Sequence, residues 1–194
     1  MLMLSACAEI RSGLLLSRKM SKVESESVKI YKQLTLKSIN SNGTIDKTLL
    51  ENFFSNEILS PSYTTHKGDV VVRLTEPYTA VCINEEMENL VIPSHFIAIR
   101  PNEKILDPDY LAWLLNNDST KMQLKKKESG IALSLIKRSN YEELIVETIP
   151  LDKQQIIAEI NKSAIRESEL LIKLAEEKIK LAKAVNKTIY NKEI

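Results

Sequence analysis

Few residues in this sequence of 194 amino acids have the types and spacing that catalysis needs. The chain has only four glycines, too few for a glycine-rich phosphate loop of the usual spacing. Gly-x-Ser-x-Gly and His-Glu-x-x-His motifs are both missing from the sequence. His66, His95, Cys7 and Cys82 form no pair with metal-ligand spacing. The sequence therefore predicts neither a protein-held metal nor a cofactor, and it favours binding over catalysis.

One segment, Asp107-Pro108-Asp109-Tyr110, invites comparison with the Asp/Asn-Pro-Pro-Tyr motif of amino-methyltransferases, in which the tyrosine stacks on a flipped base. The second proline is missing, and no cofactor-binding glycine signature precedes the segment. A capping aspartate followed by an early proline is instead typical of a helix N-terminus. The apolar positions that follow predict a helix of about four turns, broken near Asn117.

The positive charge is unevenly distributed, although the formal net charge is only +1. Residues 11–40 hold seven Lys/Arg against two Asp/Glu, and residues 111–140 hold six against two, including Lys125-Lys126-Lys127. Residues 41–110 are acidic, with five Lys/Arg against eleven Asp/Glu. Because local basic faces attract phosphate whatever the net charge, nucleic-acid binding stays open. The plain alternative for any single lysine run is a solvated helix face.

The first 149 residues are predicted to form a β-rich domain with small helices. Strands are expected over residues 28–40, 70–74, 79–83, 90–100 and 144–149, because apolar runs or alternating patterns there are bounded by turn residues. A turn is expected at 41–43, a short helix or irregular segment at 47–55, and a short helix or turn at 131–144. Pro93 implies an edge or a break in its strand. These neighbouring strands predict a curled sheet or a small barrel, and the chain as a whole is of the α+β class.

Residues 150–194 are predicted to form a second part, a single long helix from about Leu151 to Tyr190. Apolar residues recur there with a heptad period, which is typical of a coiled coil. At about 1.5 Å per residue the helix would be roughly 60 Å long, so its apolar stripe needs a partner. The seam positions, with position a at Ile157, are Ile157, Ala164, Leu171, Lys178 and Val185 at a, and Ile160, Glu167, Leu174, Leu181 and Thr188 at d.

Two opposite charges in this seam, Glu167 and Lys178, favour an antiparallel homodimer. In one register the facing pairs are Ile157–Thr188, Ile160–Val185, Ala164–Leu181, Glu167–Lys178 and Leu171–Leu174. A shift by one heptad would set Glu167 against Leu171 or Val185. An unpaired buried charge costs about 3–5 kcal/mol, so the paired register is preferred. A parallel dimer would place Glu167 against Glu167.

The order of features resembles one recognition half of the DNA-specificity subunit of type I restriction-modification systems. The resemblance covers nearly the whole chain and rests on five motifs. The first three are Glu9-Ile10-Arg11-Ser12-Gly13 as an opening strand and turn, Lys67-Gly68-Asp69 before the strand at Val70, and Ile92-Pro93-Ser94-His95-Phe96. The last two are Asp109-Tyr110-Leu111 with Leu115, and Pro150-Leu151-x-x-Gln154-x-x-Ile157 at the entry to the long helix. Full-length subunits carry two recognition domains and two long helices, whereas this chain has one of each. The resemblance therefore implies a half-length form.

The family resemblance implies recognition of double-stranded DNA without catalysis. Residues 1–149 would form the target-recognition domain, and residues 150–194 would form a spacer and dimerisation helix. A symmetric dimer should prefer an inverted repeat with a fixed gap. A methyltransferase subunit, which would bind S-adenosylmethionine and flip adenine, and a restriction subunit are the further partners that the resemblance implies.

The DNA-contacting residues are predicted from their charge and their position beside β-segments. The phosphate candidates are Arg18, Lys19, Lys37, Lys67, Arg73, Lys125, Lys126 and Lys127. The candidate base readers are Tyr78, Ser94 and His95. For each of them, an exposed charge or a packed polar residue is the structural alternative.

Two other interpretations of the whole chain stay open. It could be a coiled-coil adaptor whose globular part binds protein, or a recognition cassette without an independent function. An enzyme ranks third. The distant cysteines suit a reducing cytoplasm, and Met1 to Cys7 do not read as an export signal because no basic residue precedes Cys7 and the apolar run is short.

Overall fold

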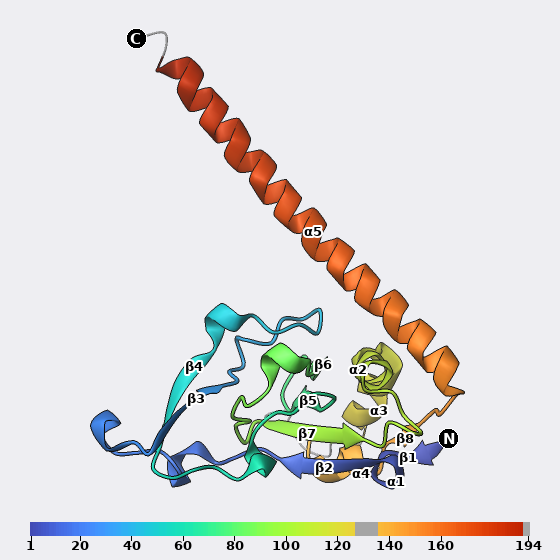
Figure 1. The fold of residues 1–194 in the computed structure, drawn as a ribbon. Coiled ribbons are helices and arrows are strands. Elements are labelled where there is room, and N and C mark those ends of the chain that lie inside the picture. Colours follow the sequence, from blue (N-terminus) through green and yellow to red (C-terminus); the bar gives the residue numbers. More distant parts are fainter. Residues whose placement is uncertain (127–135, 192–194) are drawn as a thin grey trace. The chain divides into compact units, whose positions relative to one another are not determined.

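The computed structural model describes residues 1–126 and 136–191, which separate into two units, Met1–Gln155 and Ile156–Ile194. We call them the globular unit and the helical unit. The globular unit combines short helices with small sheets, and the long helix α5 (Leu151–Tyr190) begins at its end (Figure 1). The predicted α+β class and the predicted bounds of the long helix are both confirmed.

A four-stranded antiparallel sheet forms the middle of the globular unit (Figure 1). Its strands lie in the order β2 (Ala8–Ser12), β7 (Phe96–Pro101), β5 (Val70–Arg73) and β6 (Ala80–Cys82). The apolar runs of β5 and β7 are buried because both strands have neighbours on either side. Within the described residues the edge strands β2 and β6 do not pair with each other. The alternative of a small barrel was therefore wrong.

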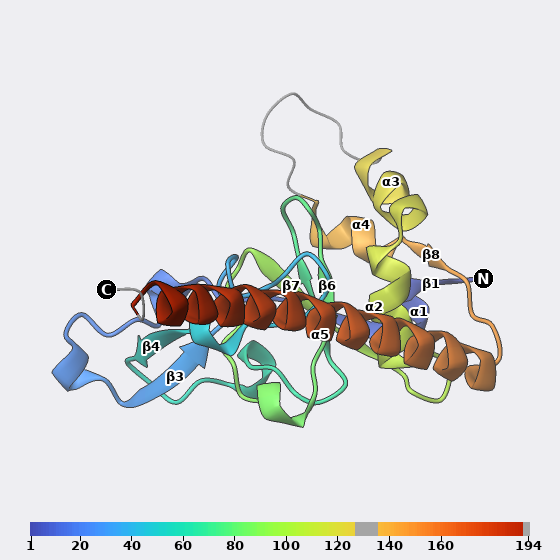
Figure 2. The same ribbon diagram turned by 90° about the horizontal axis from the view of Figure 1, so that it is seen from above.

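The remaining strands form two separate pairs, β3 (Lys29–Gln33) with β4 (Glu51–Ser55) and β1 (Leu2–Met3) with β8 (Ile145–Val146). In both views β3 and β4 lie at one end of the globular unit, whereas β1, β8 and the helices lie at the other (Figure 1 and Figure 2). The helices at that end are α1 (Leu4–Cys7), α2 (Pro108–Asn116), α3 (Asp118–Lys126) and α4 (Arg138–Glu142). Short 3-10 turns include η1 (Leu16–Arg18), η2 (Glu24–Glu26), η3 (Lys47–Leu49), η4 (Pro61–Tyr63) and η5 (Glu85–Met87).

Four predicted segments differ from the structure. The strand expected over 90–100 begins only at Phe96, after the break that Pro93 implied. The strand expected over 28–40 ends at Gln33, because Thr35 and Ser38 exchange side-chain and backbone hydrogen bonds that make a turn. Residues 47–55 contain η3 and then strand β4, whose partner β3 is too far along the chain for the local pattern to show. The strand expected over 144–149 contains only Ile145 and Val146. Part of the helix or turn expected over 131–144 lies outside the described residues.

The segment from Asp107 to Asn117 folds as predicted. The Asp107 side chain accepts a hydrogen bond from the backbone N–H of Tyr110 at 2.9 Å, and α2 ends at Asn116 before α3 begins. Tyr110 is 2% exposed and donates its hydroxyl to the carbonyl of Glu147. It therefore holds the helix against the chain and is not presented to a flipped base. The side-chain amide of Asn116 bonds both backbone groups of Ala80, which covers the edge strand β6.

Gln154 secures the first turn of α5 within the globular unit. Its side-chain oxygen accepts from the backbone N–H of Asp107 at 2.8 Å, and its amide nitrogen donates to the carbonyls of Ile105 and Ile149. The residue is fully buried. Burial of an amide is tolerated because all three contacts satisfy its polar atoms. This explains the glutamine in the Pro-Leu-x-x-Gln motif.

Asp69 links three strands of the central sheet. Its buried carboxylate accepts hydrogen bonds from Arg100 on β7 at 2.7 and 3.0 Å, from Arg11 on β2 at 3.3 and 3.4 Å, and from the backbone N–H of His66. The hydrogen bond to Asp69 raises the pKa of Arg100. Gly68 precedes it with φ +81°, a conformation in which other residues are strained. The Gly-Asp motif thus combines a turn with a buried counter-charge.

Replacement of Asp69 by asparagine should lower the free energy of unfolding by about 3 kcal/mol, because Arg11 and Arg100 lose their buried counter-charge while Arg100 keeps access to water. Urea unfolding followed by circular dichroism measures the change. Glu85→Gln is the matched control, since it breaks only the surface ion pair with Lys67 and should leave the urea midpoint unchanged. Equal midpoints for Asp69→Asn and the wild type would contradict this role of Asp69.

Candidate nucleic-acid interface

The buried segment Leu90–Pro93, called the central segment below, connects the loops that carry several candidate residues. The backbone N–H of Val91 donates to the carbonyl of Lys32, and the carbonyl of Val91 accepts from the backbone N–H of Leu34. These two hydrogen bonds join the central segment to the end of β3. Ile92 accepts from the backbone N–H of Leu14 at 2.7 Å and donates to the carbonyl of Tyr63 at 2.9 Å. Residues from three distant stretches, near 14, 63 and 94, are thereby held side by side.

Gly13 allows the loop after β2 to approach the central segment. Its N–H donates to the carbonyl of Phe96 at 3.1 Å, and a Cβ at this position would overlap the backbone carbonyl of Pro93. Any other residue would push residues 14–19 away from Ser94. Gly13 is thus required by a close backbone approach and not by a positive φ.

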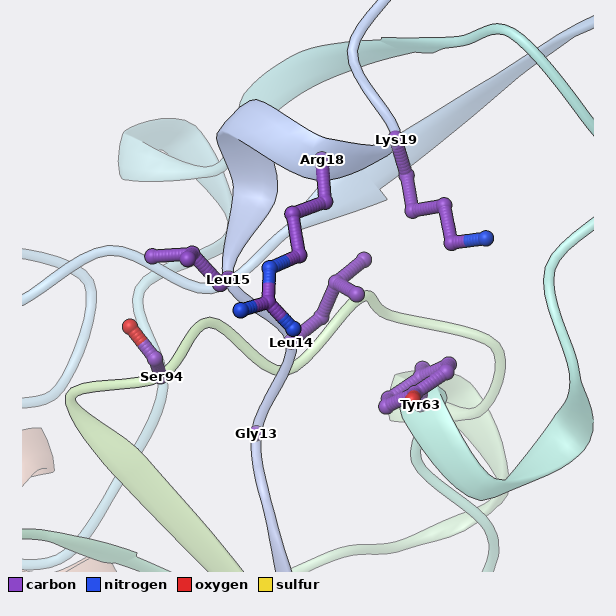
Figure 3. Close-up of a pocket in the computed structure, with 7 residues that line it drawn as sticks. All are labelled: Gly13, Leu14, Leu15, Arg18, Lys19, Tyr63 and Ser94. Atoms are coloured by element: carbon purple, nitrogen blue, oxygen red, sulfur yellow. The ribbon is translucent and has the colours of Figure 1, made fainter.

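A hollow of about 440 Å³ lies where these segments meet. We call it the Arg18 hollow; it is lined by Gly13, Leu14, Leu15, Arg18, Lys19, Tyr63 and Ser94. Figure 3 shows the Arg18 side chain extending into it, with Ser94 on one side and Tyr63 on the other. Leu14 is buried, and Tyr63 packs against the same small core. The volume falls within the range of pockets that hold small ligands, roughly 300–1,000 Å³.

Three polar groups of the hollow have no partner among the residues that the structure describes. Within residues 1–126 and 136–191, the Arg18 guanidinium, the Tyr63 hydroxyl and the Ser94 hydroxyl make no hydrogen bond or ion pair. Lys19 differs, since its ammonium pairs with Glu57 at 2.8 Å. The hollow therefore offers one unpaired cation and two hydroxyls above an apolar floor, which suits a ligand rich in hydrogen-bond acceptors.

Other predicted phosphate contacts have partners within the chain. The Arg73 guanidinium bonds the Thr75 hydroxyl and the Leu36 carbonyl. Lys67 pairs with Glu85, which together with Glu88 and Glu103 raises its pKa. Lys125 pairs with Glu76. The two lysines are partly neutralised by their carboxylate partners, so they attract phosphate less strongly than an unpaired arginine does. Arg73 keeps its charge, because both of its partners are neutral groups.

Of the predicted base readers, Tyr78 is buried and His95 is half-buried. Tyr78 is 1% exposed, with the Lys125 ammonium 5.5 Å from its ring centroid, so its ring cannot reach a base edge in this conformation. The His95 ring packs on Phe96 with centroids 4.5 Å apart, and its Nε2 is buried without a hydrogen-bond partner among the described residues. Burial and the nearby Arg73 lower the pKa of His95, which keeps the ring neutral at physiological pH.

The remaining predicted cations are less informative. Lys37 is exposed in the turn region after β3, away from the residues that line the hollow. Lys126 is the last residue of α3. Lys127 lies outside the described residues. Of the predicted set, the structure brings Arg18, Lys19 and Ser94 together at the hollow. It also places Lys125 beside Tyr78 and Arg73 near His95, but neither pair lines the hollow.

Sequence reasoning missed Tyr63 and underrated Gly13. Tyr63 follows the Ser60-Pro61 turn, where η4 starts, and a lone aromatic residue after such a turn is a weak signal. Gly13 was taken only as part of the opening strand and turn. Their roles depend on contacts with Ile92 and Pro93, some thirty to eighty residues away in the sequence.

The helical unit carries the predicted dimerisation residues on an exposed surface. Several seam residues are about half exposed or more in the single chain, namely Ile160, Leu171, Leu174, Leu181 and Val185. Ile157 is less exposed, and Ala164, Glu167 and Lys178 are exposed. Within the described part of α5, Glu167 and Lys178 make no ion pair with a neighbour. Both charges are thus available to a partner chain.

Neither a metal site nor a membrane-spanning helix is found in the described part of the chain. Among the described residues, no three His, Cys, Asp or Glu side chains are grouped so that they could hold a metal ion. No helix in the described ranges has the length and apolar character that crossing a membrane requires.

Solved structures with the same fold include the HsdS subunit from Thermoanaerobacter tengcongensis, with a TM-score of 0.66 and 18% sequence identity over 88% of this chain. A second is a chain from a structure concerning complex assembly and conformational transition of the type I R-M system, with a TM-score of 0.62 and 16% identity over 84% of this chain. This chain spans 43% and 44% of those two proteins. No family sequence model and no curated protein sequence matches it. The fold expected from the resemblance, an HsdS-like β-rich domain followed by one long helix, is confirmed.

Proposed function

We propose that this chain is a non-catalytic DNA-recognition subunit of a type I restriction-modification system that works in the cytoplasm as an antiparallel homodimer. The observation that carries the proposal is the match of a recognition domain and its long helix to less than half of an HsdS subunit. A second copy would supply the other half. The dimer would read a bipartite inverted repeat and dock a DNA adenine methyltransferase and, in systems that have one, a restriction subunit.

The charges of the globular unit support the DNA part of the proposal. Arg18 is exposed and unpaired within the described residues, and it stands beside two free hydroxyls. Arginine and hydroxyl groups are the usual contacts to phosphates and base edges in DNA complexes. Long-range attraction to DNA would come from residues 11–40, where seven Lys/Arg face only two Asp/Glu.

The pattern of α5 supports the homodimer. In the antiparallel register Glu167 of each copy meets Lys178 of the other, and Leu171 meets Leu174 at the centre. The exposed leucines and isoleucines of this seam would lose their contact with water on pairing. Two antiparallel helices place the recognition domains at opposite ends, which fixes the distance between half-sites.

The width of the apolar face on α5 supports a further helical partner. Beside the seam, heptad positions b and e carry a second set of apolar residues: Ile165, Ile172, Ile179, Ala175, Ala182 and Ile189. Ile172, Ile179 and Ile189 are each more than half exposed. A two-stranded coiled coil buries chiefly positions a and d, so this second strip is free to bind helices of a methyltransferase subunit.

Titration of duplex DNA with the full chain, alone and together with a methyltransferase subunit, tests the DNA function. The triple variant Arg18→Ala, Lys19→Ala, Arg73→Ala should bind more weakly, and its affinity should depend less on salt, because fewer phosphate contacts release fewer counterions. Lys67→Ala is the control, since Lys67 already pairs with Glu85. No DNA binding by the wild-type chain in either form would favour a protein adaptor, and an unchanged salt slope in the triple variant would show that these cations do not face DNA.

Sedimentation equilibrium tests the antiparallel register. Glu167→Lys should weaken self-association, because it sets lysine against Lys178 twice in the dimer. The double variant Glu167→Lys, Lys178→Glu should restore it by reversing both pairs. A double variant that associates no better than the single one would exclude this register.

A further inference from the structure

The Arg18 hollow is the strongest unassigned site in the described chain, and its chemistry defines its ligand. The Arg18 guanidinium only donates hydrogen bonds and carries a positive charge, whereas the hydroxyls of Tyr63 and Ser94 can donate or accept. The floor is apolar, made by Leu14 and Leu15. A cation at the rim and two hydroxyls above apolar surface match a nucleotide of duplex DNA, which offers an anionic phosphate, a polar base edge and the C–H groups of its sugar.

We propose that the Arg18 hollow takes one nucleotide of the recognised DNA, with Arg18 on its phosphate and with Tyr63 and Ser94 on its base edge. Tyr63 and Ser94 would then determine sequence preference at that position, and Arg18 would contribute affinity without preference. This inference deepens the proposed function and rests on it. It replaces Tyr78 with Tyr63 as the aromatic contact, because Tyr78 is buried and Tyr63 lines the hollow.

The hollow is rigid enough to read a base. Tyr63 is half-buried against the core of Leu14, Tyr31, Phe53, Leu59 and Val91. The carbonyl of Tyr63 accepts from the backbone N–H of Ile92, and the backbone N–H of Leu14 donates to the carbonyl of Ile92. Both sides of the hollow are therefore hydrogen-bonded to the same residue. Ser94 follows Pro93, whose carbonyl accepts from Phe96 in a tight turn. Because the backbone that carries each hydroxyl is held in place, a base edge that presents an apolar group at that point leaves the hydroxyl unpaired, which costs free energy.

Three variants separate base reading from phosphate binding without disturbing the fold. Tyr63→Phe keeps the packed ring and removes only the hydroxyl, and Ser94→Ala and Arg18→Ala change exposed side chains. Lys104→Ala is the matched control: it removes an exposed cation in the turn beyond the opposite end of β7. Circular dichroism confirms that each variant is folded.

The readout is the affinity of the full chain for a duplex that the wild type binds and for a panel of duplexes in which each base pair is changed in turn. Tyr63→Phe and Ser94→Ala should each reduce discrimination at the same base pair of every half-site, roughly 3- to 10-fold for one hydrogen bond. Their salt dependence should match that of the wild type. Arg18→Ala should weaken binding to the whole panel by a similar factor and lower the salt slope by about one contact.

Other outcomes contradict the proposal in distinguishable ways. If the wild type binds DNA and both hydroxyl variants keep its preference at every position, the hollow does not read a base. If only Arg18→Ala has an effect, the hollow is a phosphate site alone and the assignment of Tyr63 is wrong. If the wild-type chain binds no duplex, the proposed function fails and the inference fails with it. Lys104→Ala should resemble the wild type, and an effect equal to that of Arg18→Ala would show that any surface cation suffices.

Discussion

Backbone hydrogen bonding by the buried segment Leu90–Pro93 is the constraint on which the candidate interface depends. Val91 and Ile92 together bond residues near 14, 33 and 63, and Ser94 follows directly. A loop that carries polar side chains is precise only when its backbone is anchored on a rigid element. The segment Leu90–Pro93 leads into β7, which begins at Phe96. Arg100 of β7 forms an ion pair with Asp69. The buried carboxylate thus supports the interface without touching it.

Recognition by a symmetric dimer would divide the work between the two units. The globular unit would supply the contacts to one half-site, and the helical unit would fix the distance to the next. Neither task needs a catalytic group, and the most buried ion pairs among the described residues, around Asp69, are structural. At the Arg18 hollow, by contrast, a guanidinium and two hydroxyls have no partner among the described residues. The buried charges around Asp69 thus stabilise the fold, whereas the unpaired groups of the Arg18 hollow are available to a ligand.

Local sequence patterns predicted the features that depend on local interactions. The heptad period placed α5, and the Asp-Pro start and the break at Asn117 placed α2 and α3. Strand β4 was missed because its pairing with β3 is not visible within residues 47–55. Charge alone could not separate Lys67, which pairs with Glu85, from Arg18, which has no partner in the described chain. Tyr63 becomes a candidate only once Ile92 brings it beside Leu14.

The central claim is that one recognition domain and one helix per chain make a symmetric reader of DNA. Sequencing the duplexes that the wild-type chain retains from a random library tests it most directly. The antiparallel dimer predicts an inverted repeat whose two half-sites are separated by a single fixed gap, because the rigid helix pair sets one distance. Enrichment of a lone asymmetric half-site, or of inverted repeats with variable gaps, would contradict the dimer as the unit of recognition.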